Sequence, residues 1–139
     1  MTTDATEFMT RFGQVWVTGK TDEVDELMPA EVRYHLPPFP DMDREALKGF
    51  IAGFHQAFPD FTITIDETIS DADVSAHRWH CRATYTGESP LLPTPPTGQP
   101  TQATGTHFVH WHNGQAAEVW HNGDWLGWLQ TCGVVPMLG

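Results

Sequence analysis

Positive charge is scarce in this chain. Its 139 residues include seven Lys and Arg against 18 Asp and Glu, which gives a formal net charge of −11 at pH 7. Proteins that bind nucleic acid need a positive surface to replace the counterions of the phosphates, so a nucleic-acid partner is not expected. An anionic membrane surface is disfavoured for the same reason. A hydrophobic, neutral or weakly polar small molecule fits this composition better.

Long apolar runs and cysteines are scarce as well. No segment approaches the roughly 20 apolar residues that a membrane-spanning helix requires. The first ten residues, MTTDATEFMT, lack the basic and apolar regions of a signal peptide, so a cytoplasmic protein is expected. The two cysteines, Cys81 and Cys132, have neither metal-binding nor redox spacing and are expected to be buried free thiols.

Material for a hydrophobic core is plentiful. Hydrophobic residues make up 40% of the chain and include six Trp and eight Phe. A chain of this length can form a core without disulfides, so residues 1–139 are predicted to be a single domain. Apolar residues at helical spacing, bounded by capping residues and by Gly or Pro, predict amphipathic helices at 4–19, 21–29 and 43–59.

Strands dominate the second half of the chain. From Phe61 onward apolar and polar residues alternate, which is typical of half-buried strands, and Asn113-Gly114 favours a hairpin turn. The expected strands are 31–37, 61 to the turn at 70–73, 74–85, 102–112 and 116–121, with a Pro-rich loop at 88–100 and a short helix near 124–131. Helices followed by a mainly antiparallel meander predict an α+β fold, with the helices on one face of a curved sheet and a pocket between the two layers.

The most informative segment is 105–133, GTHFVHWHNGQAAEVWHNGDWLGWLQTCG. In it an E-x-W strand, Glu118 to Trp120, is followed four residues later by Asp124 and then by a helix that ends at Gly133. Upstream, FPDFTITID at 58–66 forms a helix-to-strand junction. In the order and spacing of these motifs, nearly the whole chain resembles the SnoaL-like polyketide cyclases.

The resemblance implies a nuclear-transport-factor-2-like cone that assembles as a homodimer or homotetramer. It also implies closure of a polyketide ring by intramolecular aldol condensation, without a metal or an organic cofactor. In the family an Asp is the acid–base group and a His fourteen residues earlier assists it; these positions correspond here to Asp124 and His110. A second polar partner of the family falls on Phe108, which is apolar.

The residues themselves leave the roles of Asp124 and His110 open. A carboxylate among Trp side chains has a raised pKa and suits proton abstraction, but Asp124 also stands where the N-cap of the last helix belongs. By strand parity His110 shares a face with Phe108, and His107 lies on the other face with Val109. The sequence does not decide which face lines the pocket.

Several aromatic and polar residues are predicted to contact the substrate. They can form walls for a flat ligand or donate hydrogen bonds to it, although most aromatic residues on amphipathic elements are simply core. The predicted contacts are His35, Trp79, Trp120, Phe108, Phe54 and Tyr34.

Three alternatives remain at this stage. A metal cluster of His110, His112, Glu118 and His121 has a spacing unlike the cupin motif, so no metal site is predicted. An isomerase, dehydratase or hydroxylase of the same fold would use the same carboxylate, with neutral donors at an oxyanion. A small-molecule binding module of this fold would need no catalysis at all, and an Asp124 carboxylate that points to solvent would favour it.

Overall fold

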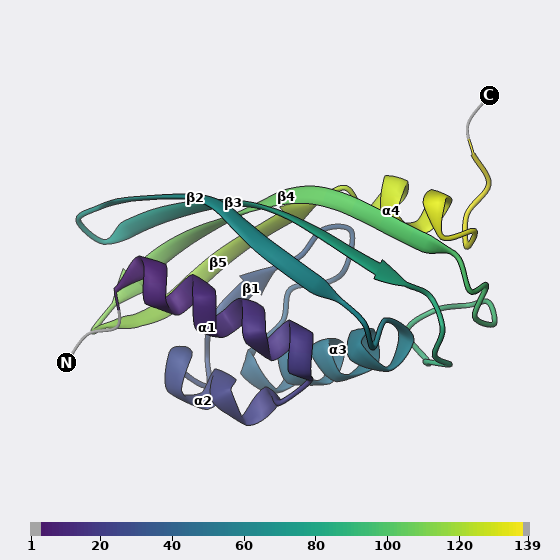
Figure 1. Cartoon of the computed structure of the whole chain (residues 1–139). Coiled ribbons are helices and arrows are strands. Elements are labelled where there is room, and N and C mark those ends of the chain that lie inside the picture. Colours follow the sequence, from purple (N-terminus) through teal and green to yellow (C-terminus); the bar gives the residue numbers. More distant parts are fainter. Residues whose placement is uncertain (1–3, 138–139) are drawn as a thin grey trace.

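The computed structural model describes residues 4–137 and confirms the predicted α+β fold (Figure 1). The helices and strands are α1 (Ala5–Thr18), a 3-10 turn η1 (Thr21–Glu23), α2 (Val24–Leu27), β1 (Arg33–His35), α3 (Arg44–Ala57), β2 (Thr62–Asp71), β3 (Val74–Thr84), β4 (Pro100–His112), β5 (Gln115–Gly123) and α4 (Trp125–Thr131). The first strand is shorter than expected. The other elements lie within a few residues of the predicted bounds.

Helix starts follow the capping residues that the sequence offers. The Glu7 backbone N–H donates to Asp4 Oδ1 at 2.8 Å, and the Ala46 N–H donates to Asp43 Oδ1 at 2.9 Å. Each bond satisfies a donor that the first helical turn leaves free. Gly19 ends α1 with φ at 73°, a left-handed conformation that glycine adopts without strain.

The five strands form one curved sheet in the order β1-β5-β4-β3-β2. Neighbouring strands are antiparallel except for β1, which pairs with β5 in parallel. Helices α1, α2 and α3 lie against the concave face, while α4 lies at the far end of the sheet (Figure 1). Side chains of alternate residues on this covered face form the core with the helices, and those on the opposite face are largely exposed.

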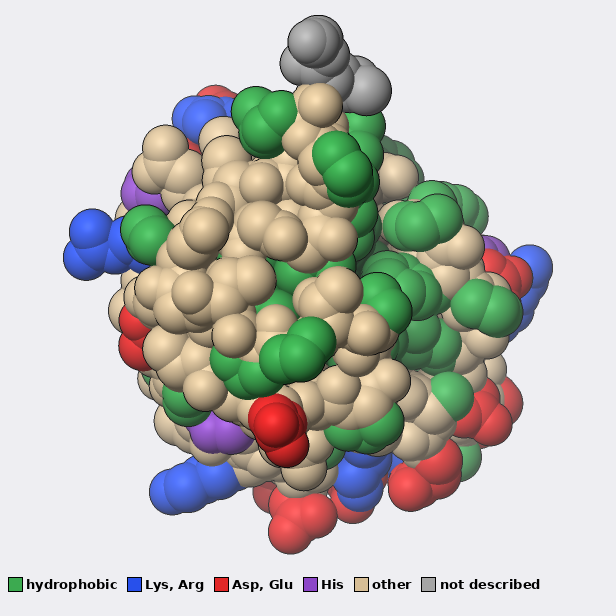
Figure 2. Space-filling model, turned by 90° about the vertical axis from the view of Figure 1, so that its right-hand side faces the viewer, with side chains coloured by type: hydrophobic (Ala, Val, Ile, Leu, Met, Phe, Trp, Pro, Cys, Tyr) green, Lys and Arg blue, Asp and Glu red, His purple; other side chains and the backbone are tan. Residues whose placement is uncertain are grey.

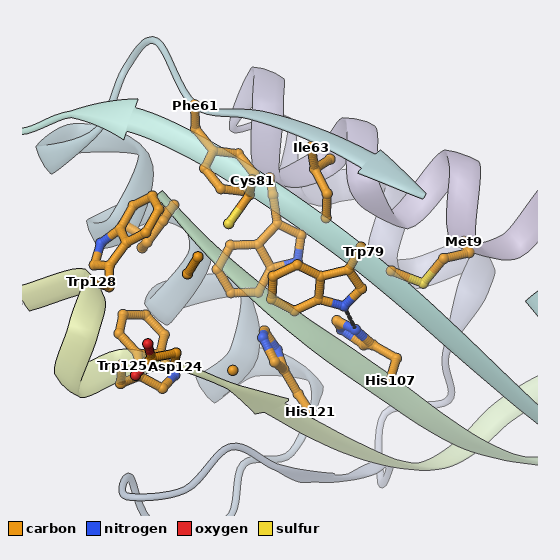
Figure 3. Close-up of a pocket in the computed structure, with 14 residues that line it drawn as sticks. Met9, Phe61, Ile63, Trp79, Cys81, His107, His121, Asp124, Trp125 and Trp128 are labelled. Atoms are coloured by element: carbon orange, nitrogen blue, oxygen red, sulfur yellow. Dashed lines mark hydrogen bonds between the residues drawn. The ribbon is translucent and has the colours of Figure 1, made fainter. Parts of the chain in front are cut away.

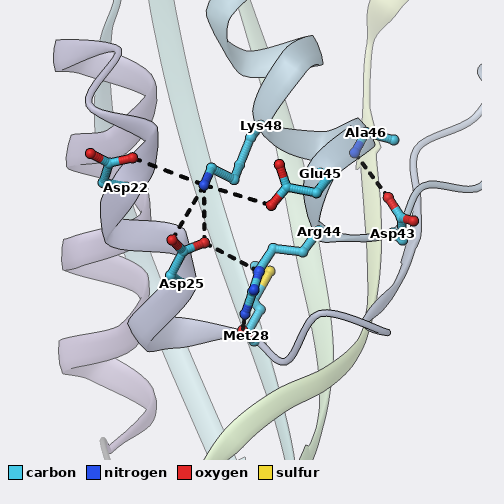
Figure 4. A network of polar contacts seen from close by, with 8 residues as sticks. All are labelled: Asp22, Asp25, Met28, Asp43, Arg44, Glu45, Ala46 and Lys48. Atoms are coloured by element: carbon cyan, nitrogen blue, oxygen red, sulfur yellow. Dashed lines mark hydrogen bonds and ion pairs between the residues drawn. The ribbon is translucent and has the colours of Figure 1, made fainter.

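A polar network holds α2 against α3 (Figure 4). Lys48 Nζ on α3 lies 3.0 Å from Asp25 Oδ1 and 3.9 Å from Asp22 Oδ1. Beside it Arg44 Nη1 donates to the Met28 carbonyl at 3.1 Å. Two of the chain's few cations therefore fix the helical layer in place and are not available as an anion-binding surface.

Candidate functional site

A narrow apolar pocket lies between the concave face of the sheet, helices α1 and α3, and the start of α4 (Figure 3). Its cavity volume is about 40 Å³, room for little more than water. Seen from the α4 end, the surface shows hydrophobic side chains gathered around a hollow (Figure 2). The pocket is lined by Met9, Trp16, Phe54, Phe61, Ile63, Trp79, Cys81, Ala103, His107, His121, Gly123, Asp124, Trp125 and Trp128.

Two buried histidines supply most of the polarity inside the pocket. His107 on β4 and His121 on β5 are neighbours in the strand register, and their ring centroids lie 4.2 Å apart. Burial lowers the pKa of His121 to about 3. Burial, together with the nearby imidazoles of His121 and His77, holds the pKa of His107 well below its usual range. Both rings are therefore neutral at physiological pH.

A chain of hydrogen bonds connects these histidines to Trp79 and Tyr34. Trp79 Nε1 lies 2.7 Å from His107 Nδ1. The Tyr34 hydroxyl lies 3.1 Å from His107 Nε2 and 2.7 Å from His121 Nδ1. Burial raises the pKa of Tyr34 well above its ordinary value, so the phenol keeps its proton. These bonds pair both nitrogens of His107 and the Tyr34 hydroxyl, as buried polar groups require, and leave His121 Nε2 free among the described residues.

Asp124 lies at the pocket's α4 end but its side chain is not enclosed. It is exposed, and the backbone N–H of Gly127 donates to its Oδ1 at 2.9 Å. The interpretation of Asp124 as the N-cap of the last helix is therefore confirmed. A Cβ on Gly127 would lie 2.2 Å from Asp124 Oδ2, so a larger residue there would force this carboxylate to shift. The expectation of a carboxylate sheltered by Trp side chains is wrong: Trp125 and Trp128 line the same pocket but leave the carboxylate exposed, and Trp120 lies on the outer face.

The structure does not bring His110 to Asp124. His110 is exposed on the outer face of β4, where its ring lies 5.0 Å from that of Trp120. The parity argument correctly grouped His107 with Val109, and the covered face proves to be theirs. The pairing of Asp124 with His110 across the pocket is wrong in its geometry, because successive residues of a strand point to opposite faces.

The six predicted substrate contacts divide in the same way. Trp79 and Phe54 line the pocket, and Tyr34 lies fully buried behind the two histidines. Phe108 and Trp120 belong to the outer face, so for them a contact inside the pocket is wrong.

His35 also lies on the outer face, away from the pocket. Its Nδ1 lies 2.8 Å from Asp41 Oδ1 and its Nε2 lies 2.7 Å from Glu118 Oε2, while its ring stacks on Trp120. Burial lowers the pKa of His35, but the hydrogen bonds to Glu118 and Asp41 outweigh it and the pKa rises. His35 thus belongs to a cluster of ion pairs with Asp41 and Glu118, and its predicted contact with a ligand in the pocket is wrong.

His107 and His121 were not predicted from the sequence as site residues. The available signal was the set of residues on the same strand face: His107 alternates with Val109 and Trp111, and His121 alternates with Val119. Two β-branched or aromatic neighbours on one face mark that face as the covered one. The same criterion would have placed the more polar face, with His110 and His112, toward solvent.

The alternative metal cluster is not assembled. His121 points into the pocket, whereas His110 and Glu118 lie on the other face of the sheet. Within residues 4–137 no three His, Cys, Asp or Glu side chains are grouped as metal ligands would be. In the same residues no helix has the length and apolar character needed to cross a membrane.

Three solved structures illustrate the similarity of the fold. TsrD from Streptomyces laurentii superposes with a TM-score of 0.82 at 20% sequence identity, covering 96% of this chain and 99% of TsrD. IdmH, a proposed polyketide cyclase from Streptomyces antibioticus, has a TM-score of 0.77 at 25% identity, covering 93% and 98%. A structure named Rd1NTF2_04 with long sheet has a TM-score of 0.65 at 17% identity, covering 86% and 100%. Among curated proteins no sequence matches significantly.

The helical layer, the curved sheet and the apolar pocket define a nuclear-transport-factor-2-like α+β protein. A family model described as SnoaL-like polyketide cyclase matches residues 6–131. The chain therefore belongs to the SnoaL-like polyketide cyclase family, as its C-terminal motif predicted.

Proposed function

We propose that this protein is a cofactor-independent acid–base enzyme that closes a ring in a hydrophobic, carbonyl-bearing small molecule by intramolecular aldol condensation. The observation that carries the proposal is the meeting of a carboxylate and a neutral imidazole at one apolar pocket: Asp124 at the rim and His121 inside. Membership of the polyketide cyclase family supports the same reaction class. The assisting imidazole is His121 in place of His110.

In the proposed reaction Asp124 takes a proton from a carbon that lies between two carbonyl groups. The enolate carbon then attacks a second carbonyl of the same molecule, a C–C bond forms, and the attacked oxygen becomes an alkoxide. That oxygen receives the proton which Asp124 carries, so the step is balanced and redox-neutral. An N–H of His121 stabilises the negative oxygen by a hydrogen bond in a site from which water is largely excluded.

The exposure of Asp124 is compatible with this role once a ligand is bound. A ligand over the pocket mouth would remove water from the carboxylate, and desolvation raises the pKa of a carboxyl group. The hydrogen bond from the Gly127 N–H, which a bound ligand need not disturb, orients the carboxylate without neutralising its charge. Substrate binding would therefore create the apolar surroundings that the free protein lacks.

The pocket must widen to admit a ring. Drug-sized ligands occupy roughly 300–1,000 Å³, far more than the space in which water now fits. The part of the wall most suitable to move is Trp125 at the start of α4, because it is half-buried while Trp128, Trp79 and Phe54 are fully packed. Admission of substrate is thus proposed to involve displacement of Trp125.

The test is Asp124→Asn, assayed with linear and partly cyclised polyketide esters and with product analysis that also detects isomerised or dehydrated compounds. Asn is as good an N-cap as Asp, so α4 keeps its start while the base is lost. We expect turnover to fall by at least about a hundredfold, the usual scale for a lost general base. Asp43→Asn, at the cap of α3, is the matched control. Full turnover by the Asp124 variant would remove this residue from the mechanism.

A second candidate is a non-catalytic binding module, which the exposed, helix-capping carboxylate favours. A binding module should bind flat apolar ligands equally well in the wild-type protein and in Asp124→Asn, and it should release them chemically unchanged. Calorimetry combined with product analysis of the same samples separates the two functions.

A further inference from the structure

The hydrogen bonds of the pocket can run in one direction only, and their starting point is Trp79. An indole Nε1–H donates and never accepts. Because it lies 2.7 Å from His107 Nδ1, that nitrogen must carry the lone pair. A neutral imidazole has a single N–H, so the proton of His107 is on Nε2.

The next two bonds follow from the first. His107 Nε2–H donates to the Tyr34 oxygen at 3.1 Å. Tyr34 has one proton of its own, and it donates that proton to His121 Nδ1 at 2.7 Å. His121 Nδ1 therefore accepts, and the only proton of the neutral His121 ring is on Nε2.

That last N–H faces the pocket. Among the described residues the His121 ring is hydrogen-bonded at Nδ1 alone, which leaves Nε2 available. A Cβ placed on the pocket-lining Gly123 would lie 4.0 Å from this Nε2. Figure 3 shows the His121 ring directed into the pocket beside Trp79.

We infer that the chain Trp79→His107→Tyr34→His121 locks His121 as a hydrogen-bond donor toward the ligand and prevents it from acting as a base. Trp79, His107 and Tyr34 are then positioning residues that act through His121. The His121 Nε2–H suits ligands that place an acceptor oxygen beside it inside the pocket, such as the oxygen of a carbonyl or an enolate. The donor role rests on the proposed function, whereas the tautomer of His121 is a property of the free protein.

A second feature shows that the start of this chain is built into the sheet. Trp79 on β3 is paired with Gly105 on β4. A Cβ at residue 105 would lie 2.4 Å from two ring carbons of Trp79, so any larger residue would displace the indole. The glycine creates the space in which the indole N–H reaches His107.

Nitrogen-15 NMR of the imidazoles in the ligand-free protein tests the inference, because it distinguishes the two neutral tautomers. We expect both His107 and His121 to be Nε2–H tautomers. Trp79→Phe removes the donor and should allow His107 to populate the other tautomer; Tyr34→Phe should do the same for His121. The control is Trp111→Phe, whose indole donates to Ser75 Oγ at 2.9 Å and so belongs to a different chain of bonds.

The outcomes decide each part separately. An Nδ1–H or charged His121 in the wild-type protein overturns the inference, and this measurement needs no variant to fold. Unchanged His121 in Tyr34→Phe overturns the role of the chain. The ligand class is tested with 1-tetralone against tetralin, which lacks the carbonyl. Tyr34→Phe lets His121 leave the Nε2–H form part of the time, so tetralone binding should weaken about two- to fivefold while tetralin binding stays unchanged. Equal effects on both ligands overturn the donor role. A correct tautomer in a protein without turnover would refute the cyclase alone.

Discussion

The Tyr34 hydroxyl lies 2.7 Å from His121 Nδ1, although 87 positions separate the two residues in the chain. The parallel pairing of β1 with β5 brings them together, since Tyr34 is opposite Val119 in the register. A short strand from the helical half of the chain thus supports the imidazole in the pocket. The remote connection makes the site sensitive to a residue that never lines it.

Tyr34→Phe should lower the free energy of unfolding by about 1–3 kcal/mol. The substitution keeps the ring but leaves one nitrogen on each histidine without a partner in a buried site. Urea denaturation at pH 7.5 measures the change. Tyr85→Phe is the control, because that hydroxyl donates to the carbonyl of Thr94 in the Pro-rich loop, away from the pocket. Equal losses in the two variants would show that the position of the hydroxyl does not matter.

Gly105→Ala should destabilise the protein by about 1–3 kcal/mol, the usual cost of overpacking. The added Cβ would overlap the Trp79 ring, so the tryptophan fluorescence should shift as well. Gly49→Ala is a matched substitution in α3 with nothing within 4 Å of the new Cβ. It should stabilise the helix by about 0.5–1 kcal/mol. A neutral result at residue 105 would show that the indole can move without cost.

Stability should fall as the pH drops below about 6.5, the usual pKa of an unfolded histidine. Burial lowers the folded-state pKa of His121 to about 3 and that of His77 to about 4. Between these values the unfolded chain binds protons that the folded chain does not. Each such histidine therefore lowers the free energy of unfolding by about 1.4 kcal/mol for each pH unit below about 6.5, down to its folded-state pKa. Above that pH the ring is neutral in both states, and it costs no stability.

Denaturation midpoints from pH 7.5 to 5.5 measure this slope before most carboxylates titrate. His77→Gln should reduce the slope by up to one proton. A flat profile in the wild-type protein would mean that the buried rings accept protons as readily as unfolded ones.

Capping and catalysis by Asp124 should separate in two substitutions. Asp124→Ala should lose both turnover and about 1 kcal/mol of stability, because the Gly127 N–H loses its acceptor. Asp124→Asn should lose turnover and keep stability. Asp43→Ala should lose comparable stability and keep turnover, since it caps α3 far from the pocket. Loss of turnover in Asp43→Ala would point to a general effect of helix fraying.

The local elements follow from the sequence because their causes are local. Asp4, Asp43 and Asp124 cap the helices where the chain places them before apolar stripes, and alternation from Phe61 onward marks the strands. Motif order in the C-terminal half was enough to identify the family. Each of these signals spans a few residues or a fixed spacing, which an unfolded chain already contains.

The prediction from sequence left the choice between His107 and His110 open, and the tertiary structure decided it. Alternation assigns them to opposite faces of β4, but which face is covered depends on where the helices pack. The same packing sends Trp120 outward and seats Tyr34 behind the pocket through a parallel pairing that the sequence did not reveal. Sequence by itself determined which residues could be neighbours along an element; contact between distant elements determined which of them share the pocket.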